Sequence, residues 1–356
     1  MALNAEAIAD LIATTLKKFD KPEWVNLTTL RQNFVALPKI LKKDKVEEES
    51  GTAVEWRVQI GNSGYAQNIG LYATITPNVG NTFQTASVPW RNTTTNHSYD
   101  RREFEMNRDP SRIVNLIKGR RLDAMVSLAE LLETNFWGQP SSSTDVLTPY
   151  GILYWIVYNA TDGFTGANNS NWSAGPGGLS AATYTQWCNY CATYTNITKT
   201  DLIVKWRKAA TLTNFVCPVP DDEEPLARKG HRFGYYCDYS NVLSTLETLL
   251  EAQNDNLGND LASKDGETLF RKIPVTYVAQ LEPTANGGPF TSTNQPIFGI
   301  DWSTFVPVML KDEAIREGKP RVPSNQPSVV VSDVDLTWNL KCWSRRNQFL
   351  LATAAF

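Results

Sequence analysis

Cysteine is the residue type whose spacing in this chain first suggests chemistry. Cys188 and Cys191 form a Cys-x-x-Cys pair, and Cys217 and Cys237 follow later in the sequence. Four thiolates can hold a structural zinc ion, but such sites join this pair to a second Cys-x-x-Cys or to two closely spaced histidines. The chain offers neither, and its total of five cysteines is odd. We therefore interpret the cysteines as small, half-buried side chains, with no metal site and no disulfide framework.

The other titratable groups form no catalytic pattern that we recognise. The two histidines, His97 and His231, are far apart in the sequence, and the chain has no nucleophile-elbow, phosphate-loop or paired-histidine zinc motif. The acidic run 221–224 (DDEE) lacks the alternating spacing of a calcium loop and is typical of a solvated loop. We therefore expect no enzymatic activity and no cofactor.

Basic side chains are concentrated in one part of the chain, at Arg108, Arg112, Lys118, Arg120 and Arg121. Two interpretations are open: salt bridges within a protein assembly, or contact with DNA or with an acidic loop of a neighbouring molecule. The net charge of -3 and the pI of about 5.6 show no overall basic excess. DNA affinity is therefore not the main design feature, and any such contact is expected to be weak and non-specific.

The apolar pattern along the chain predicts an α+β protein. One of its elements is an extended arm over 51–106. The stretch 51–106 is polar and free of lysine, and from Val54 to Ile60 apolar and polar residues alternate as in a strand. Glycine and proline punctuate 61–83, which indicates an open loop, and 85–104 forms a second extended run. A lone two-stranded arm is marginal in water, so we expect it to lie on a partner surface.

A long amphipathic helix follows the arm. Asp109 and Pro110 suit the N-cap and first helical positions, apolar residues recur as far as Phe136, and Gly138 ends the pattern. The helix is predicted to have roughly 28 residues and a length of about 40 Å, against a mean of about 11–12 residues in globular proteins. We call it the spine helix.

The remaining segments alternate between strands and helices. The first 20 residues contain Glu6 and Asp10, which favours an amphipathic helix over a signal peptide, and no apolar run is long enough to span a membrane. We therefore expect a protein made in a cytoplasm. Further strands are predicted over 152–157, 274–278, 296–300, 328–343 and 349–352, and further helices over 199–215 and from Ser240.

This order of elements resembles the tailed-bacteriophage major capsid proteins of the Hong Kong ninety-seven-like fold. The end of the chain, from Val329 to Ala352 (VVVSDVDLTWNLKCWSRRNQFLLA), and the Asp109-Pro-Ser-Arg-Ile start of the spine helix carry most of the likeness. The resemblance implies an N-terminal arm, an extended β-hairpin loop, and peripheral and axial domains. The implied bounds are 1–50 for the arm, 51–106 for the extended loop, 107–150 for the peripheral domain with the spine helix, 151–320 for the axial domain and 321–356 for the closing strands of the peripheral domain.

Two features depart from members of that family. Some members join subunits through a Lys–Asn isopeptide bond with the lysine on the extended loop, whereas 51–106 has no lysine, so we expect no such cross-link. Some carry a long fused N-terminal scaffold, whereas only about 20 helical residues precede Lys21 here. The resemblance therefore implies a separate scaffolding protein, with a portal and a decoration protein as further partners.

The function implied is structural: pentamers and hexamers of an icosahedral phage head around double-stranded DNA, assembled in the host bacterial cytoplasm. Aromatic anchors on the loop and charges around the spine helix are the expected subunit contacts, the loop acids Glu103 and Glu105 pairing with basic residues of a neighbour's spine helix. The alternatives are an encapsulin-type compartment shell and a carbohydrate-binding or tail-associated module that stacks sugars on Trp155, Trp172 and Trp187. The expected interface residues are Trp56, Tyr65, Tyr72, Phe83, Trp90, Glu103, Glu105, Arg108, Arg112, Lys118, Arg120 and Arg121.

Overall fold

The protein is built from two β-sheets, a long helix and a projecting hairpin. The computed structural model describes residues 34–41, 46–61, 64–75, 80, 82–106, 110–169, 172–214, 233–248, 268–284 and 290–355. The predicted helix over 1–20, Arg108, Cys217, the acidic run 221–224 and His231 lie outside the described residues. Among the described residues, no helix has the length and apolar character needed to cross a membrane.

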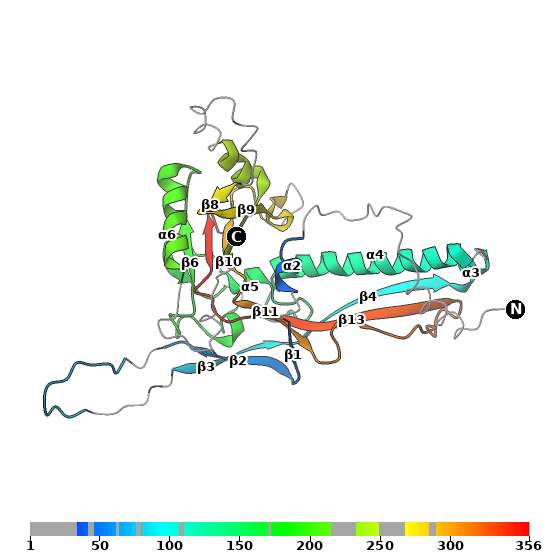
Figure 1. Cartoon of the computed structure of the whole chain (residues 1–356), viewed down its shortest axis with the longest axis horizontal. Coiled ribbons are helices and arrows are strands. Elements are labelled where there is room, and N and C mark those ends of the chain that lie inside the picture. The colour runs from blue at the N-terminus through cyan, green and yellow to red at the C-terminus, as the bar shows by residue number, and fades with distance from the viewer. Residues whose placement is uncertain are drawn as a thin grey trace.

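The first sheet has five strands and lies along the spine helix (Figure 1). Its central strand β13 (Val329–Cys342) pairs with β4 (Arg91–Asp100), β11 (Phe305–Leu310) and β12 (Arg316–Glu317), and β1 (Glu47–Glu49) extends β11 in parallel. Along most of β13, buried residues alternate with half-buried ones, as expected for a strand with one face against the core. The spine helix, α4 (Pro110–Trp137), covers β4, and short α3 (Arg101–Met106) joins the two.

The second sheet has seven strands in the order β5-β6-β14-β10-β7-β9-β8. Its middle strands are buried on both faces, so they appear in the sequence as continuous apolar runs rather than alternating ones. The strands are β5 (Gly163–Gly166), β6 (Asn189–Thr193), β14 (Phe349–Ala352), β10 (Ile297–Asp301), β7 (Phe233–Cys237), β9 (Ile273–Tyr277) and β8 (Leu269–Phe270). The helical elements of this half are the π-helical turns η2 (Lys199–Ile203) and η4 (Tyr239–Leu243), helix α6 (Val204–Leu212) and the 3-10 turn η7 (Ala279–Leu281).

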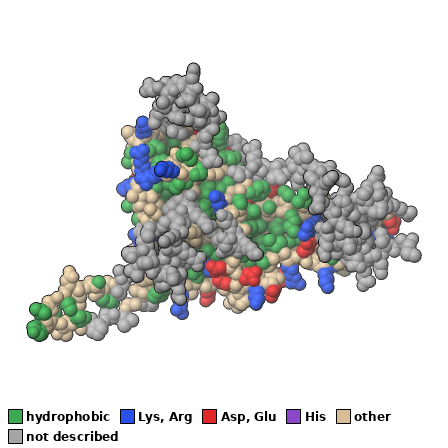
Figure 2. All heavy atoms as spheres, in the orientation of Figure 1, with side chains coloured by type: hydrophobic (Ala, Val, Ile, Leu, Met, Phe, Trp, Pro, Cys, Tyr) green, Lys and Arg blue, Asp and Glu red, His purple; other side chains and the backbone are tan. Residues whose placement is uncertain are grey.

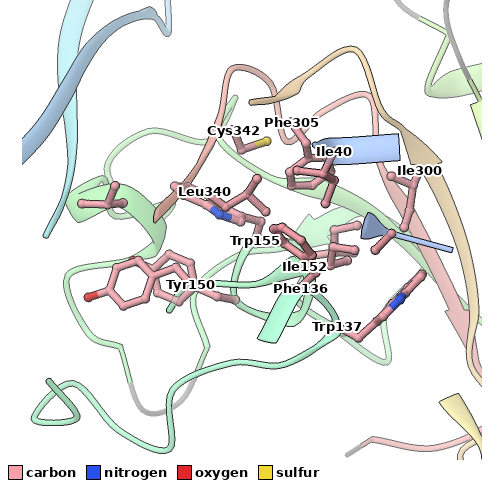
Figure 3. Close-up of a cluster of buried hydrophobic side chains, with 14 of the residues drawn as sticks. Ile40, Phe136, Trp137, Tyr150, Ile152, Trp155, Ile300, Phe305, Leu340 and Cys342 are labelled. Atoms are coloured by element: carbon pink, nitrogen blue, oxygen red, sulfur yellow. The ribbon is translucent and has the colours of Figure 1, made fainter. Parts of the chain in front are cut away.

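An aromatic core joins the two halves (Figure 3). The end of α4 supplies Phe136 and Trp137. The ring of Phe136 lies 4.9 Å from Trp338 of β13, and the ring of Trp137 lies 5.6 Å from Tyr236 of β7. Because one helix end packs against both sheets, one core extends across the described halves of the chain, and a second core lies between the seven-stranded sheet and α6.

Most elements predicted within the described residues are confirmed, but the strand over 152–157 and the extent of the arm are wrong. The spine helix has the predicted 28 residues and starts at Pro110. The strand expected over 152–157 is instead the helical turn α5 (Ile152–Trp155). A short, fully apolar run does not separate a strand from a buried helix. Gly151, which precedes this turn, packs so closely on the end of α4 that a Cβ there would lie 2.2 Å from the Asn135 carbonyl oxygen.

The predicted arm is shorter than 51–106. Strands β2 (Ala53–Gln59) and β3 (Phe83–Pro89) pair with each other, but the chain then turns at Trp90, and β4 leaves the hairpin to pair with β13. The turn has a physical cause, because the inward-facing residues of β4 bury against the spine helix and β13 rather than continuing the hairpin. The projecting part of the chain is therefore the β2–β3 hairpin with its loop, and β4 belongs to the first sheet.

Candidate functional site: hairpin tip and spine helix

The hairpin lies against the body at its base, and its tip projects away from the body (Figure 1). In β2, Val54, Trp56 and Val58 face inward, while Glu55 and Arg57 face solvent. The Trp56 ring lies 5.9 Å from the ring of Trp155, inside the chain's own core. The alternating pattern of β2 thus fixes the base of the hairpin rigidly to the body.

The tip exposes apolar side chains that no described part of the chain covers. Leu71 is 94% exposed and Tyr72 is 102% exposed, at the turn of the loop between β2 and β3. Tyr72 also has a positive φ of 65°, which a bulky residue seldom adopts. Figure 2 shows hydrophobic side chains at the end of this projection. Tyr65, Ile69 and Ile75 of the loop and Phe83 at the start of β3 are exposed as well. Several exposed apolar side chains on one projection are typical of a protein-binding site.

The expected aromatic anchors therefore separate into two groups. Tyr65, Tyr72 and Phe83 are exposed on the projecting segment. The proposed role of Trp56 as an exposed anchor does not fit this structure, since its side chain is 5% exposed. Trp90 is half-buried, and its Nε1–H donates to the Gly51 carbonyl oxygen at 3.0 Å, which closes the base of the hairpin. The alternation of apolar and polar residues along β2 places Trp56 on the inward face. The sequence pattern could therefore have shown that Trp56 differs from the tip residues.

The charges around the spine helix are paired within the chain. The guanidinium of Arg120 lies 2.7 Å from the Glu103 carboxylate, and it also donates to the Ser98 carbonyl oxygen. Arg121 forms a two-pronged contact with Glu317 of β12, with a shortest distance of 2.9 Å. Arg120 of the same chain thus already pairs with Glu103, and contact of Glu103 with a neighbour stays a prediction. This arrangement supports the first of the two interpretations of the basic cluster.

The remaining expected contact residues lie near the same end of the helix. Glu105 is exposed and Lys118 is half-buried. For Arg112 the structure describes the helical backbone only. Their roles in subunit contact stay predictions.

Glu133 is a functional residue that the sequence analysis missed. Its carboxylate is fully buried on α4 and accepts hydrogen bonds from the backbone N–H groups of Val35, Ala36 and Leu37 at 2.7–3.0 Å. The Trp137 indole N–H donates to the same carboxylate at 3.0 Å. Since these N–H groups start the short helix α2 (Leu37–Ile40), Glu133 caps that helix and fastens the N-terminal arm to the spine helix. An acid inside an apolar helical stripe, between Leu132 and Phe136, was the available signal.

Replacing Glu133 by alanine should release residues 35–37 of the N-terminal arm from the spine helix. The substitution leaves three backbone donors unsatisfied, so we expect a loss of roughly 2–4 kcal/mol in the free energy of unfolding. Hydrogen exchange at Val35, Ala36 and Leu37 should accelerate much more than exchange in the middle of α4. Asp123→Asn, on an exposed position of the same helix, is the control. Equal protection of 35–37 in the Glu133 variant and the control would contradict the assigned role.

A buried lysine pairs with two acids of the run 47–49 (EEE). The Lys341 side chain is 3% exposed, and its Nζ contacts Glu47 and lies 3.3 Å from Glu49. The same Nζ lies 4.8 Å from the centre of the Trp343 ring. These contacts hold the edge strand β1 on β11, so Glu47 and Glu49 bind their own chain.

Arg345 holds the connection between β13 and β14. It is fully buried and donates to the carbonyl oxygens of Trp155, Trp187, Gly166 and Ala167, and to the Asn189 side-chain oxygen, at 2.6–3.2 Å. Burial lowers the pKa of the guanidinium to about 10, so it still carries its proton at neutral pH. Since all five acceptors are neutral, the forked shape of the side chain decides its fit.

His97 lies under the spine helix at the other end of the first sheet. Its side chain is 3% exposed, and neither ring nitrogen has a hydrogen-bond partner among the described residues. Glu317, Arg121 and Asp333 are the charged groups that face it, with Glu317 3.9 Å from Nε2. Burial lowers the pKa of His97, and Arg121 adds to this, against the opposing effect of the two acids. The neutral imidazole is therefore the native form.

Stability should fall on mild acidification because of His97. The unfolded histidine takes up a proton near pH 6.5, whereas the folded one does so only at lower pH. The unfolded state thus binds more protons below about pH 6.5, and the free energy of unfolding decreases there by up to about 1.4 kcal/mol per pH unit. Urea unfolding at pH 7.5 and 5.5 should show this decrease in the parent and in His231→Gln. A decrease that persists undiminished in His97→Gln would refute the assignment.

The described residues contain no arrangement for metal or nucleophilic chemistry. No group of three or more His, Cys, Asp or Glu side chains within the described part is placed to hold a metal ion. Cys188, Cys191 and Cys237 are buried, and burial raises the pKa of each thiol, that of Cys191 to about 11. Protonated thiols of this kind are poor nucleophiles and poor ligands.

The tryptophans expected to stack sugars are core residues. Trp155 is fully buried, Trp187 is 3% exposed and Trp172 is 7% exposed. Trp187 donates to the Pro176 carbonyl oxygen, and Trp172 packs edge-on against Tyr150 and Tyr154. The carbohydrate-binding alternative therefore loses the platforms on which it rested.

Comparison with solved structures identifies the architecture. The chain resembles the capsid of cyanophage A-1(L) over 98% of its own length and 99% of that chain, at 12% identity and a TM-score of 0.61. For the capsid of a native GTA particle the coverage is 99% and 100%, at 15% identity and a TM-score of 0.54. For cyanophage P-SCSP1u it is 96% and 94%, at 12% identity and a TM-score of 0.51. No family model and no curated protein matches the sequence. The likeness shows the fold, which confirms the predicted phage capsid fold over nearly the whole chain.

Proposed function

We propose that this protein is a phage capsid subunit that assembles with copies of itself into a closed, icosahedral shell of pentamers and hexamers around double-stranded DNA. The observation that carries the proposal is the exposed apolar tip, with Leu71 and Tyr72, on a hairpin whose base is rigidly packed. A free monomer gains nothing from such a projection. In a shell, the same side chains bury against the next subunit.

The energetics fit repeated, modest contacts. Full burial of one large apolar side chain contributes about 1.5–3 kcal/mol. The tip side chains together therefore offer several kcal/mol to each contact, before the loss of rigid-body freedom is subtracted. A contact of this size is weak for one pair but strong when every subunit repeats it around a closed shell. Because 51–106 has no lysine, we propose that the loop contributes no lysine to an isopeptide cross-link at this contact.

The finer partners follow from the same proposal. Because the chain carries no overall basic excess and Arg120 and Arg121 are paired internally, contact with packaged DNA is weak and non-specific. A separate scaffolding protein, a portal and a decoration protein complete the proposed set, with assembly in the host bacterial cytoplasm and residence in the virion.

Electron microscopy with size-exclusion chromatography of the purified chain tests the proposal. We expect closed shells, tubes or stable rings, with or without a co-expressed scaffolding protein. The shell diameter separates a phage head from a small encapsulin-type compartment. A chain that stays a monodisperse monomer of about the 39.8 kDa chain mass at high concentration, with scaffolding protein present, would refute the proposal.

A further inference from the structure

A second surface, away from the hairpin, carries a cavity with an aromatic floor and a basic rim. The cavity has a volume of about 260 Å³ and lies between α6 and the β8–β9 hairpin. Trp206 and Phe270 stack at its floor, with ring centres 4.3 Å apart, and Lys199, Arg207 and Arg271 line it as well. Figure 2 shows Lys and Arg side chains gathered on this side of the molecule, over α6.

The rim cations have unused charge. Within the described part of the chain, Lys199, Arg207 and Arg271 form no ion pair, whereas their neighbour Lys205 is paired with Asp201 at 2.9 Å. Arg271 is held in place by a 2.9 Å hydrogen bond to the Thr211 hydroxyl. It also shares a two-residue hairpin turn with Lys272, and both residues have positive φ (50° and 66°), where Asn-Gly is the usual choice. The turn thus places two cations where small residues would fit with less strain.

The floor also has an unused donor. Trp206 is 1% exposed, and its indole N–H has no acceptor among the described residues. An unpaired buried donor costs about 1–3 kcal/mol, but the indole nitrogen is not accessible from the cavity, so it does not enter the choice of ligand. Three cations beside an apolar, aromatic lining fit an acidic peptide with apolar or proline residues beside its carboxylates.

We propose that this cavity binds the acidic run 221–224 of a neighbouring copy of the chain. The run places four consecutive carboxylates between Pro220 and Pro225, and Pro218 precedes it. Such proline spacing favours an extended peptide that pays little ordering entropy on binding. The other acidic run, 47–49, is already engaged through Lys341. Charge complementarity therefore selects 221–224 among the acidic runs of the chain.

Contact between two different surfaces of identical subunits is head-to-tail. A head-to-tail contact repeats around an axis and closes into a ring, as a pentamer or hexamer requires. Only the assignment of the peptide to a neighbouring copy rests on the proposed function. Binding of the peptide by the cavity can be measured without assembly.

The test uses the full chain with its own run neutralised by Asp221→Asn, Asp222→Asn, Glu223→Gln and Glu224→Gln. A fluorescent peptide of residues 218–226 should bind it saturably, and the peptide with the same four acids neutralised should bind at least tenfold more weakly. Adding Arg207→Gln and Arg271→Gln to the chain should weaken binding at least tenfold, while Arg57→Gln and Arg101→Gln, at exposed positions elsewhere, should not. No saturation up to about 1 mM peptide, or equal effects of the two pairs, would overturn the proposal.

Mixing distinguishes a neighbour's run from the chain's own. The variant with the neutralised run keeps the cavity, and the variant with Arg207→Gln and Arg271→Gln keeps the run. The two variants should associate through this contact when mixed, although neither should self-associate through it. Failure to associate, together with peptide binding, would overturn the assignment to a neighbour. If the peptide binds and the mixed chains pair, but no shell forms under any condition, the capsid proposal fails while the cavity keeps its assigned ligand.

Discussion

The double substitution Leu71→Asp, Tyr72→Asp is expected to abolish shell assembly without unfolding the subunit. Both side chains are almost wholly exposed in the single chain, so the change removes no internal packing. In the assembled shell it would bury two carboxylates in an apolar contact, which costs more than the contact provides. Electron microscopy should show no closed shells, and circular dichroism and the unfolding midpoint should match the parent.

Val322→Asp is the matched control for this prediction. Val322 is 43% exposed and lies after β12, away from the hairpin, so the same chemical change tests surface charge in general. We expect this variant to assemble. Normal shells from the Leu71, Tyr72 variant would show that the tip is not a subunit contact, whatever else the shell uses.

The substitution Arg345→Met should have the largest effect on stability. It leaves the acceptors of five hydrogen bonds without their donor in the interior. Bonds from charged groups contribute about 1.5–3 kcal/mol each but are not additive, so we expect a total loss of roughly 4 kcal/mol or more. That is a large part of the 5–15 kcal/mol typical of a native protein. The variant should be largely insoluble, or should unfold at much lower urea concentration.

Arg345→Lys separates charge from shape. Lysine keeps the charge but cannot reach several carbonyl oxygens with one ammonium group, so most of the loss should remain. Arg316→Lys, at a side chain that is 62% exposed, should change the free energy of unfolding by less than about 0.5 kcal/mol. A fully stable Arg345→Lys would indicate that charge alone suffices at this position.

Long, strongly patterned elements could be predicted from the sequence, and tertiary contacts could not. The spine helix has a proline start, a glycine stop and a sustained apolar stripe, and the structure agrees with its predicted length. The end of the hairpin at Trp90 was missed, because both β3 and β4 are extended and only the partner strand tells them apart. The helix α5 was taken for a strand because its short apolar run has no readable period.

The residues of the candidate site divide in the same way into those whose exposure is a local property and those whose contacts depend on the tertiary fold. Exposure of Tyr65 and Tyr72 agrees with their position in a glycine-rich loop, which is a local property. The pairing of Glu103 with Arg120 depends on how α3 folds back on α4, and the burial of Glu133 depends on where residues 35–37 arrive. Such contacts join residues up to about a hundred positions apart, and spacing along the chain carries no information about them.

The position of β13 and β14 in the chain has a consequence for how the protein is synthesised. Each is an interior strand of its sheet, and every strand that pairs with them lies earlier in the sequence. On the ribosome, β4, β11 and β10 therefore emerge before the strands that complete their sheets. The first sheet cannot close until Cys342 has left the exit tunnel, and the second cannot close until Ala352 has, so a nascent chain cannot present a finished subunit to its neighbours. Translation itself would then delay association until each copy is ready.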